Sequence, residues 1–400
     1  MNYDSLSIVR VLYQKQDLDE DNLIAACMAQ GLGIGNYKME QISDIRRHIL
    51  DSIYHQRIRL KTINNAHKII TDKLMKLSMF PHYTFDLDIL YGALDGQKYE
   101  AATGTIKARN SKKYFKKGRG VVAYTLLVNH IPIDTQIIGP HEHESYYAFD
   151  IWYNNISLIH PMVLTGDMHV INKTSFALFH WFGAELRPRF TNLKKELQNI
   201  SGTKNASAYK NFLVKPVGKL TKQLILEEEE NLDRIVASLA LKEINQSILV
   251  KKLCNLPAQN KTLRAIFEYN KLIRDIYTLK CILNPQMLVD AHRSQNRIES
   301  YHTLRAAIAK VGGRKALIGK GDIEIEISNK IGSLIALCII YYNFLIKSRI
   351  LDMDPKNKKL ITQLKKSSTV VWGHIHLGGK FVFYTRNKID IEKIIQNIKV

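Results

Sequence analysis

The chain has 400 residues, which is enough for two or three domains with sizeable cores. An apolar fraction of 46% with only nine prolines predicts a folded chain and excludes one with long disordered tails. The formal net charge of +21 favours a polyanionic partner, with nucleic acid first and an anionic membrane as the rival. We find no polybasic tail or lipidation signal to support the membrane, and a merely basic soluble protein is the third interpretation.

Cysteine usage and hydropathy indicate a cytosolic protein. The four cysteines show no CxxC motif and no cysteine–histidine spacing for zinc, so we expect reduced thiols. The first ten residues, MNYDSLSIVR, lack the basic and apolar regions of a signal peptide. The longest apolar run, 331–346, includes Ser333 and Asn343 and predicts a buried helix rather than a bilayer span. The cysteines are Cys27, Cys254, Cys281 and Cys338.

Residues 1 to about 80 are predicted to be helical. Apolar residues recur there at helical intervals, as at Ile42, Ile45, Ile49 and Ile53. The GLGIG at 31–35 lacks the strand-and-helix context of a dinucleotide fingerprint, so we expect a turn.

From residue 84 to about 189 the pattern changes to short strands. A helix at about 142–155 should follow three antiparallel strands, and MVLTGD (162–167) should return as a strand beside the first. That order places Asp95, at the end of its strand, next to Asp167. The three antiparallel segments are YTFDLDILYGALD (83–95), YEAATGTIKAR (99–109) and GVVAYTLLVNHIPIDTQIIG (120–139).

The remainder is predicted to be mostly helical. Helices are expected within 190–285, over 286–310, and at about 328–351 and 356–366. The terminal VVWGHIHLGGKFVF (370–383) is predicted to form a short hairpin. Expected core positions between 190 and 285 are Leu239, Leu241, Ile244, Ile248 and Leu253.

Three acidic residues stand where chemistry at phosphorus would need them. Asp95 and Asp167 end apolar runs, and Glu299 lies in a segment with helical periodicity. Two carboxylates at adjacent strand ends and a third from a facing helix can hold two Mg²⁺ ions, because magnesium prefers oxygen ligands. Each residue also has an ordinary interpretation, as a turn former or as an exposed helical glutamate. Their flanking sequences decide between the two.

Those flanking sequences resemble the replicative transposases of the Tn3 family, in order and approximate spacing along the whole chain. The similarity begins around DNLIAACMAQGLGIGNYKME, near residue 21, and IEIEIS (323–328) is expected to be helical on this resemblance although it alternates like a strand. The matching segments are DGQKYEA (95–101), ARNSKKYF (108–115), GVVAYTLLVNHIP (120–132), IIGPHEHESYYAFDIWYNN (137–155), TGDMHVINKTSFALFHWFG (165–183), IVASLALKEINQSILVKKL (235–253), NRIESYHTLRAAI (296–308), LCIIYYN (337–343) and VVWGHIHLGGKFVF (370–383).

The resemblance implies a DDE transposase, with Asp95, Asp167 and Glu299 as its catalytic and metal-binding triad. On this resemblance Asp95 would bridge two Mg²⁺ ions, which Mn²⁺ can replace, and the other two carboxylates would each complete one ion's shell. The implied reaction cuts transposon ends and transfers the 3′-hydroxyl into target DNA. By family resemblance the outcome is replicative and leaves a cointegrate.

The implied fold is α/β (α+β): an RNase H-like mixed sheet with helices, interrupted by a mostly helical insertion between the second and third acidic residues and flanked by helical segments. The expected divisions are a helical N-terminal segment at 1–80, a catalytic domain in two parts at 81–190 and 286–315, a helical insertion at 191–285, and a C-terminal helical region at 316–400 with its terminal hairpin.

Several further residues are candidates for the site. His169 and His302 are expected beside the carboxylates, and Arg297 and Arg305 are expected to contact DNA phosphate. His141 and His143 flank Glu142 in GPHEHES, but on the resemblance this segment starts the crossover helix and holds no separate metal. A basic loop with two aromatic residues, Tyr114 and Phe115, predicts DNA backbone contact. Its cations are Lys112, Lys113, Lys116, Lys117 and Arg119.

The chain also departs from the family. Gly166-Asp167-Met168-His169-Val170 stands where many members carry Thr-Asp-x-His-Gly, and the large N-terminal region that recognises transposon ends is not matched. We therefore expect the catalytic C-terminal portion of a transposase, from a truncated gene, a split protein or a fragment. The alternatives are a catalytically inert DNA-binding remnant and an RNase H-like nuclease without strand transfer. We expect a bacterial cytoplasmic, nucleoid-associated protein that is at least a dimer when two ends are paired.

Overall fold

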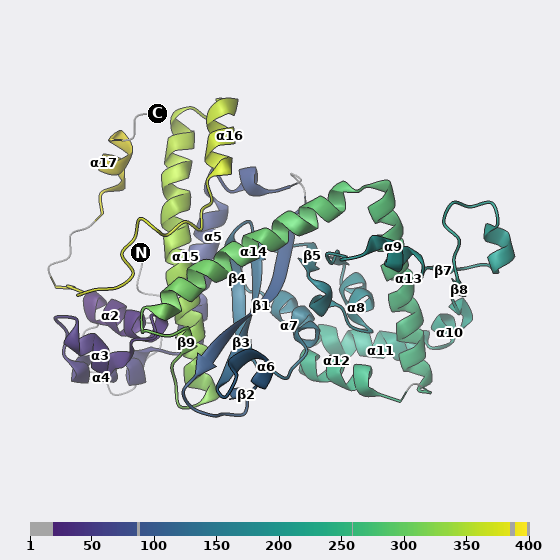
Figure 1. Ribbon diagram of the computed structural model, residues 1–400, viewed down its shortest axis with the longest axis horizontal. Helices are drawn as coiled ribbons and strands as arrows, with labels where there is room; N and C mark the ends of the chain where they lie inside the picture. The colour runs from purple at the N-terminus through teal and green to yellow at the C-terminus, as the bar shows by residue number, and fades with distance from the viewer. Residues whose placement is uncertain (1–18, 86–88, 258, 385–388, 398–400) are drawn as a thin grey trace.

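A curled mixed sheet forms the centre of the computed structural model, which describes residues 19–85, 89–257, 259–384 and 389–397 (Figure 1). Its main strands lie in the order β4-β3-β1-β5-β6, antiparallel through β4, β3 and β1 and parallel from β1 to β6. This order and the surrounding helices confirm the predicted RNase H-like α/β class. The strands are β1 (Tyr91–Ala101), β2 (Arg109–Asn110), β3 (Arg119–Val128), β4 (Ile131–Ile138), β5 (Val163–Gly166), β6 (Glu185–Leu186) and β9 (Ala316–Leu317).

The antiparallel part differs from the prediction in its boundaries. Segment 120–139 was expected to be one strand but forms the β3–β4 hairpin. Asn129 and His130 both have positive φ angles, 47° and 72°, and a two-residue turn of this kind matches the twist of a hairpin. The Asn at the first turn position was the available sequence signal.

The predicted strand at 99–109 is wrong. β1 continues to Ala101, because β3 pairs with it as far as Glu100 and β9 pairs with its last two residues. Residues 102–108 then form a turn in which the backbone N–H of Ala108 donates to the Thr105 hydroxyl at 2.8 Å.

The N-terminal segment is helical, as predicted, in the part that the structure describes; residues 1–18 of the prediction lie outside it. The GLGIG segment is a turn, with Gly33 and Gly35 at φ angles of 67° and 74°. The helices are α2 (Glu20–Gly31), α3 (Gly35–Gln41), α4 (Arg47–Arg57) and α5 (Leu60–Met75), followed by the 3₁₀ turn η1 (Pro81–Tyr83).

Helix α15 (Asp322–Met353) covers β4 and the N-terminal helices. It includes 323–328, so the helical prediction there is confirmed. By length and composition α15 could cross a membrane, but 56% of its most apolar window is buried inside the protein, as in a core helix. Helix α16 (Lys358–Lys366) follows near its predicted position, and α17 (Ile391–Gln396) lies near the C-terminus.

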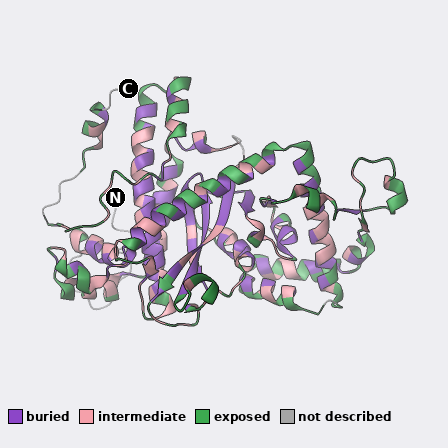
Figure 2. Ribbon diagram, viewed as in Figure 1, coloured by how far each residue is buried: buried purple, intermediate pink, exposed green. Residues whose placement is uncertain are grey.

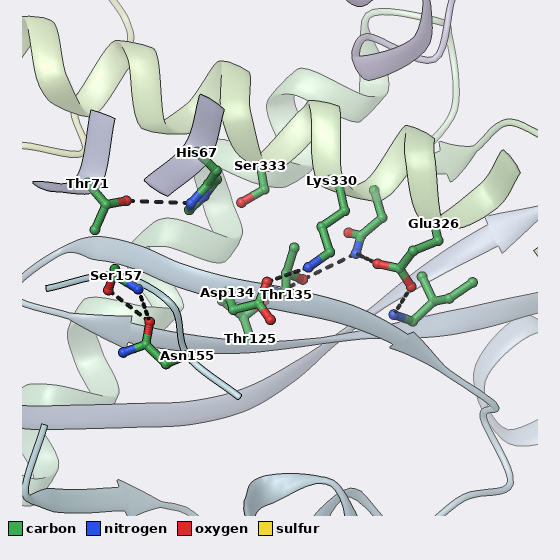
Figure 3. Close-up of polar contacts among 12 residues, drawn as sticks. His67, Thr71, Thr125, Asp134, Thr135, Asn155, Ser157, Glu326, Lys330 and Ser333 are labelled. Atoms are coloured by element: carbon green, nitrogen blue, oxygen red, sulfur yellow. Dashed lines mark hydrogen bonds and ion pairs between the residues drawn. The ribbon is translucent and has the colours of Figure 1, made fainter. Parts of the chain in front are cut away.

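A buried polar network joins α15 to β4 (Figure 3). Lys330 forms an ion pair with Asp134, and Glu326 accepts the backbone N–H of Ile137 at 2.7 Å. Asn329 donates to the Thr135 hydroxyl at 3.3 Å. These contacts fix the position of the helix along the strand, because a shift would leave buried polar groups unpaired.

The segment between the sheet and α14 is mostly helical, as predicted. Leu239 and Leu253 are buried, but the prediction of a core position is wrong for Leu241, Ile244 and Ile248, which are exposed. The elements are α9 (Leu193–Leu197), β7 (Ser201–Gly202), η4 (Ala206–Tyr209), β8 (Gly218–Lys219), α10 (Lys222–Glu227), α11 (Glu229–Ala240), α12 (Gln246–Asn255) and α13 (Lys261–Leu283).

The predicted hairpin at 370–383 is wrong. This segment pairs with the N-terminal helical region instead of with itself: the N–H of Phe381 donates to the Ile42 carbonyl at 2.7 Å, and the N–H of Phe383 donates to Asp44. Asn343 of α15 holds its start by donating to the Thr369 and Val371 carbonyls.

Helix α14 (Gln286–Lys310) crosses in front of the sheet in Figure 1 and contacts β1 and β5. The sheet strands beneath it are largely buried (Figure 2). The crossover from β4 to β5 runs through η2 (Glu144–Tyr146) and α7 (Ala148–Tyr153), as expected for 142–155. After β5 come η3 (Met168–Val170) and α8 (Ser175–Trp181), and α6 (Lys112–Phe115) lies between β2 and β3.

Candidate active site

The register of β1 and β5 brings the first two acidic residues to one place. The parallel pairing ends at Leu94 and Gly166, so Asp95 and Asp167 are the next residues on adjacent strands. The prediction that Asp95 ends its strand is wrong, since it pairs with Thr125 in the middle of the long strand β1. β3 continues to pair with β1 past Asp95, whereas β5, the neighbour on the other side, ends at Gly166. The end of β5 leaves room for a carboxylate on that side of β1.

Helix α14 brings Glu299 and His302 to Asp95. Ile298, Tyr301, Leu304 and Ile308 form the buried stripe of this helix, and Glu299 lies at its exposed border. Ligand atoms of Asp95, Glu299 and His302 all lie within 4.8 Å of one another. The structure therefore places Asp95 of β1 close to Glu299 of α14, with His302 of the same helix beside them.

Gln97 positions α14 against β1. Its side-chain amide donates to the backbone carbonyl of His302 at 2.6 Å, and its own oxygen accepts the Tyr99 hydroxyl. Asp95, Gln97 and Tyr99 alternate along β1 and so share the sheet face that α14 covers. The DGQ motif at 95–97 thus contains an acidic residue and the side chain that holds the facing helix, a role that the sequence alone did not assign.

Asp95 is destabilised in its charged form. Burial raises the pKa of Asp95 to about 7, and the carboxylates of Glu144, Glu299 and Asp167 add to the rise. Its side chain is 16% exposed, and the nearest cationic candidate, Nδ1 of His302, is 3.5 Å from Oδ2. Burial and the nearby Lys315, Arg305 and Lys98 lower the pKa of His302 to about 3, so this histidine is neutral and leaves the negative charge uncompensated.

Asp167 is more open than Asp95. Its side chain is 46% exposed, Oδ1 accepts the backbone N–H of His169 at 2.7 Å, and the His169 ring nitrogen lies 4.0 Å from Oδ2. His169 therefore lies beside the second carboxylate, and His302 lies beside the first.

Glu144 is a fourth carboxylate at this place, and the sequence interpretation missed it. Its carboxylate covers the backbone of Gly96: a Cβ added there would lie 2.4 Å from Oε1, so a larger residue would displace the Glu144 carboxylate. Burial raises the pKa of Glu144, while Lys98 opposes the rise. The available signal was its place at the start of the crossover helix, in a segment that was weighed only for His141, Glu142 and His143.

The donor set fits a hard divalent cation. Carboxylate oxygens are the ligands that Mg²⁺ and Mn²⁺ accept, and the raised pKa of Asp95 records a cluster of like charges that a cation would neutralise. In the GPHEHES segment, Glu142 forms an ion pair with Lys251 at 2.5 Å. The four cysteines are free thiols, as predicted.

The predicted basic loop is exposed and is partly helical, since Lys112 and Lys113 belong to α6. Lys98 of β1 lies over the Tyr114 ring at 4.4 Å, which places this loop over the strand that carries Asp95. Lys116, Lys117 and Arg119 are exposed as well and are free to contact a polyanion.

The two arginines of α14 that were predicted to contact DNA, Arg297 and Arg305, do not lie on an open surface. Arg305 is 2% exposed and donates to the Asn329 carbonyl and side chain on α15, so the prediction that it contacts DNA is wrong. Arg297 donates to the Asn129 side chain at 3.1 Å and lies 4.1 Å from the Phe85 ring centre; burial lowers its pKa to about 10. Both guanidinium groups are engaged in holding α14 in place.

Known proteins resemble the chain over nearly its whole length. The family described as "Tn3 transposase DDE domain" matches residues 4–381. The chain is 23% identical over 378 residues to the transposase for transposon Tn2501 of Escherichia coli, covering 92% of this chain and 37% of that protein. It is 22% identical over 370 residues (90% and 36%) to the gamma-delta transposase of E. coli strain K12, and 21% over 403 residues (95% and 38%) to the Tn1546 transposase of Enterococcus faecium. The chain thus spans somewhat over a third of the length of these relatives.

Proposed function

The chain belongs to the Tn3 family of DDE transposases, and from this premise we propose that Asp95, Asp167 and Glu299 catalyse cleavage at transposon ends and strand transfer into target DNA. The observation that carries the proposal is the convergence of Asp95, Glu299 and His302 within 4.8 Å, with Asp167 following the strand beside Asp95. The replicative outcome, a cointegrate, is part of the proposal and rests on the family.

The three carboxylates would hold two Mg²⁺ or Mn²⁺ ions. When bound, such ions activate the attacking oxygen and stabilise the leaving oxygen in displacement at phosphorus. In the first step a water oxygen bonds to phosphorus, and the bond from phosphorus to the 3′-oxygen of the transposon end breaks. In the second step that 3′-hydroxyl attacks a target phosphate and displaces the 3′-oxygen of the target strand.

The surrounding residues prepare this chemistry. Gln97 fixes α14 relative to β1, so Glu299 is presented to Asp95 from a rigid helix. His302 stays neutral beside Asp95 and adds no positive charge that would compete with a metal. The exposed cations of the 112–119 loop are proposed to hold the DNA backbone near the site, and we propose that the protein acts in the bacterial cytoplasm at the nucleoid, at least as a dimer when two ends are paired.

Cleavage and joining can be measured directly. The purified chain is incubated with intact or pre-nicked transposon-end DNA, which report cleavage and joining respectively, and a plasmid target in Mg²⁺ or Mn²⁺, beside Asp167→Asn. We expect joined products from the native chain and none from the variant. Cutting without joining would support the nuclease alternative, and a folded chain that binds DNA but does neither would support the inert remnant.

A further inference from the structure

A basic arm extends from the helical segment between β6 and α14. It comprises residues 201–219 and projects beyond the body of the molecule at the end away from α15 (Figure 1). Its tip is exposed in Figure 2, and its apolar side chains face solvent: Leu213 is 99% exposed, Val217 77% and Phe212 59%. Large apolar side chains gathered on a projecting element indicate a binding surface.

The arm has a defined base. Its two ends pair as the parallel strands β7 and β8, and the backbone N–H of Ser201 donates to Asp275 of α13 at 2.9 Å. Near the tip, the Tyr209 hydroxyl accepts the backbone N–H groups of Thr203 and Lys204, each at 3.1 Å, which folds the chain back on itself. The Tyr209 ring meets Phe212 edge to face at 5.6 Å between centroids.

The charge of the arm has one sign. Between Glu196 and Glu227 the sequence contains no aspartate or glutamate, and its lysines are exposed where they lie in the arm. The cations flank the apolar tip on both sides, so a ligand that meets Phe212 and Leu213 also meets positive charge. The arm lysines are Lys204, Lys210, Lys215 and Lys219.

A groove lies between the segment that follows Asp167 and Asp275 of α13, which holds the base of the arm. Residues 171–173 follow η3, which begins directly after Asp167, and they form one wall of a groove of about 660 Å³. Lys271 of α13 lies on the opposite wall and also approaches β8, where a Cβ on Gly218 would be 3.3 Å from its Nζ. Lys173, Lys271 and Arg274 line this groove together with Glu196 and Asp275, so its lining carries both signs of charge.

We propose that the arm binds duplex DNA that leaves the active site on the side of the molecule where the arm projects, with its lysines on phosphates and Phe212 and Leu213 against the bases. The inference rests on the proposed function and names a DNA contact that lies outside the 112–119 loop. Lysines supply sequence-independent affinity through counterion release. Apolar side chains at a projecting tip can wedge between base pairs and bend the duplex. A protein partner fits less well, because the acid-free segment matches a continuous polyanion better than a mixed surface.

The lysine contribution is measured by salt dependence. The full chain is titrated with a fluorescein-labelled 40-base-pair duplex at several salt concentrations. The triple variant Lys204→Gln, Lys210→Gln, Lys215→Gln should lower the slope of log K against log salt by about 3. The matched control changes three exposed lysines of α16 (Lys358→Gln, Lys359→Gln, Lys366→Gln) and should change the slope by less than half as much. Equal effects of the two triples would overturn the proposal.

The tip contribution is measured separately. Phe212→Ala with Leu213→Ala should weaken binding about 5-fold to 100-fold without changing the salt slope, and should reduce the fluorescence increase of a 2-aminopurine base in the duplex. Unchanged affinity and fluorescence, or loss of self-association in sedimentation instead of loss of DNA binding, would overturn it. Circular dichroism verifies that each variant folds.

Asp167→Asn separates this inference from the proposed function. That variant should bind DNA with the native salt slope while losing cleavage and joining. If the native chain is active but the arm variants bind DNA normally, the arm proposal is wrong and the transposase proposal is unaffected. If the arm variants bind DNA more weakly but the native chain is inactive, the transposase proposal is wrong and the arm proposal is unaffected.

Discussion

Asp95 lies on a buried strand near three other carboxylates, and its charge is therefore unfavourable without a cation. Its folded pKa of about 7 exceeds its ordinary value of 3.8, so between about pH 4 and pH 7 the folded chain binds a proton that the unfolded chain has released. Stability must fall as pH rises through this window and stay low above it. The site is thus a source of instability that a bound metal, under the proposed function, would remove.

We predict that Asp95→Asn stabilises the metal-free protein. In EDTA at pH 8, urea unfolding should give a free energy of unfolding roughly 1–3 kcal/mol above the native value, with little difference at pH 4. Mg²⁺ should then raise the midpoint of the native chain but not that of the variant, because only the native site binds the ion. A variant less stable than the native chain in EDTA would show that Asp95 is structural.

We predict that Gln97 is a positioning residue. Gln97→Met removes the donor to the His302 carbonyl and should lower the free energy of unfolding by about 1–3 kcal/mol, since the contact is buried. It should reduce joining more than DNA binding. The control is Ser300→Ala, an exposed position one residue past Glu299, which should change neither. Native joining by Gln97→Met would remove Gln97 from the account.

At the scale of single residues, the sequence was more informative about which residues are candidates for the site than about which side chains surround them. Asp95, Asp167 and Glu299 were predicted from flanking motifs, and the structure places the other two carboxylates near Asp95. Glu144, a further carboxylate near Asp95, was not predicted, because its position depends on the close approach of the crossover to Gly96. Arg305 was misplaced although a signal existed. It lies seven residues after Ile298 and three before Ile308, on the same helical stripe, and both isoleucines are buried.

Among the elements, α15 is held to β4 by charges that lie mostly inside the protein. The Lys330 side chain is 10% exposed and that of Asp134 is 33% exposed. Removing one partner leaves the other charge unpaired in a poorly solvated place, which is more costly than removing both.

We therefore predict a coupling between Asp134 and Lys330. Asp134→Leu should lower the free energy of unfolding by about 1–3 kcal/mol, and Asp134→Leu with Lys330→Met should recover at least half of that loss. Denaturant unfolding of the two single variants and the double variant provides the cycle. Additive losses would mean that the ion pair contributes nothing specific.

Element types were predicted well where a long pattern exists, as for the helices at 286–310 and 328–351. The ends of the strands were predicted poorly, because a strand extends as far as its neighbouring strands continue to pair with it. β1 passes through Asp95 only because β3 and β9 extend beside it, and neither partner is visible from the residues of β1.

For the whole molecule, buried neutral histidines predict sensitivity to acid. Burial lowers the pKa of His67 to about 4, and that of His130 falls well below its ordinary value for the same reason. Below about pH 6.5 the unfolded chain binds protons that the folded chain refuses, so stability falls as pH falls, by up to about 1.4 kcal/mol per pH unit for each histidine.

We predict that His67→Gln weakens this dependence. Between pH 6 and pH 5, the unfolding free energy of the native chain should fall more steeply than that of the variant, by about 1 kcal/mol per pH unit. The matched control is His48→Gln, an exposed histidine, which should run parallel to the native chain. Parallel curves for His67→Gln would mean that His67 is protonated in the folded state.

The pairing of the strand at 162–167 with the first strand could be predicted at this scale because chain order constrains topology. The docking of 370–383 onto the N-terminal helices could not, since its contacts join residues more than 300 positions apart, such as Asp44 and Phe383. Local pattern there favoured a hairpin, and tertiary contacts replaced it.

The central claim, that Asp95, Asp167 and Glu299 share one metal site, is tested most directly by metal-directed backbone cleavage. Fe²⁺ replaces Mg²⁺, and ascorbate with peroxide generates radicals that cut the chain near the ion. We predict cuts near all three residues in the native chain, suppressed by excess Mg²⁺ and lost together in Asp95→Asn. Cuts near only one of the three, or cuts that persist in the variant, would contradict a shared site.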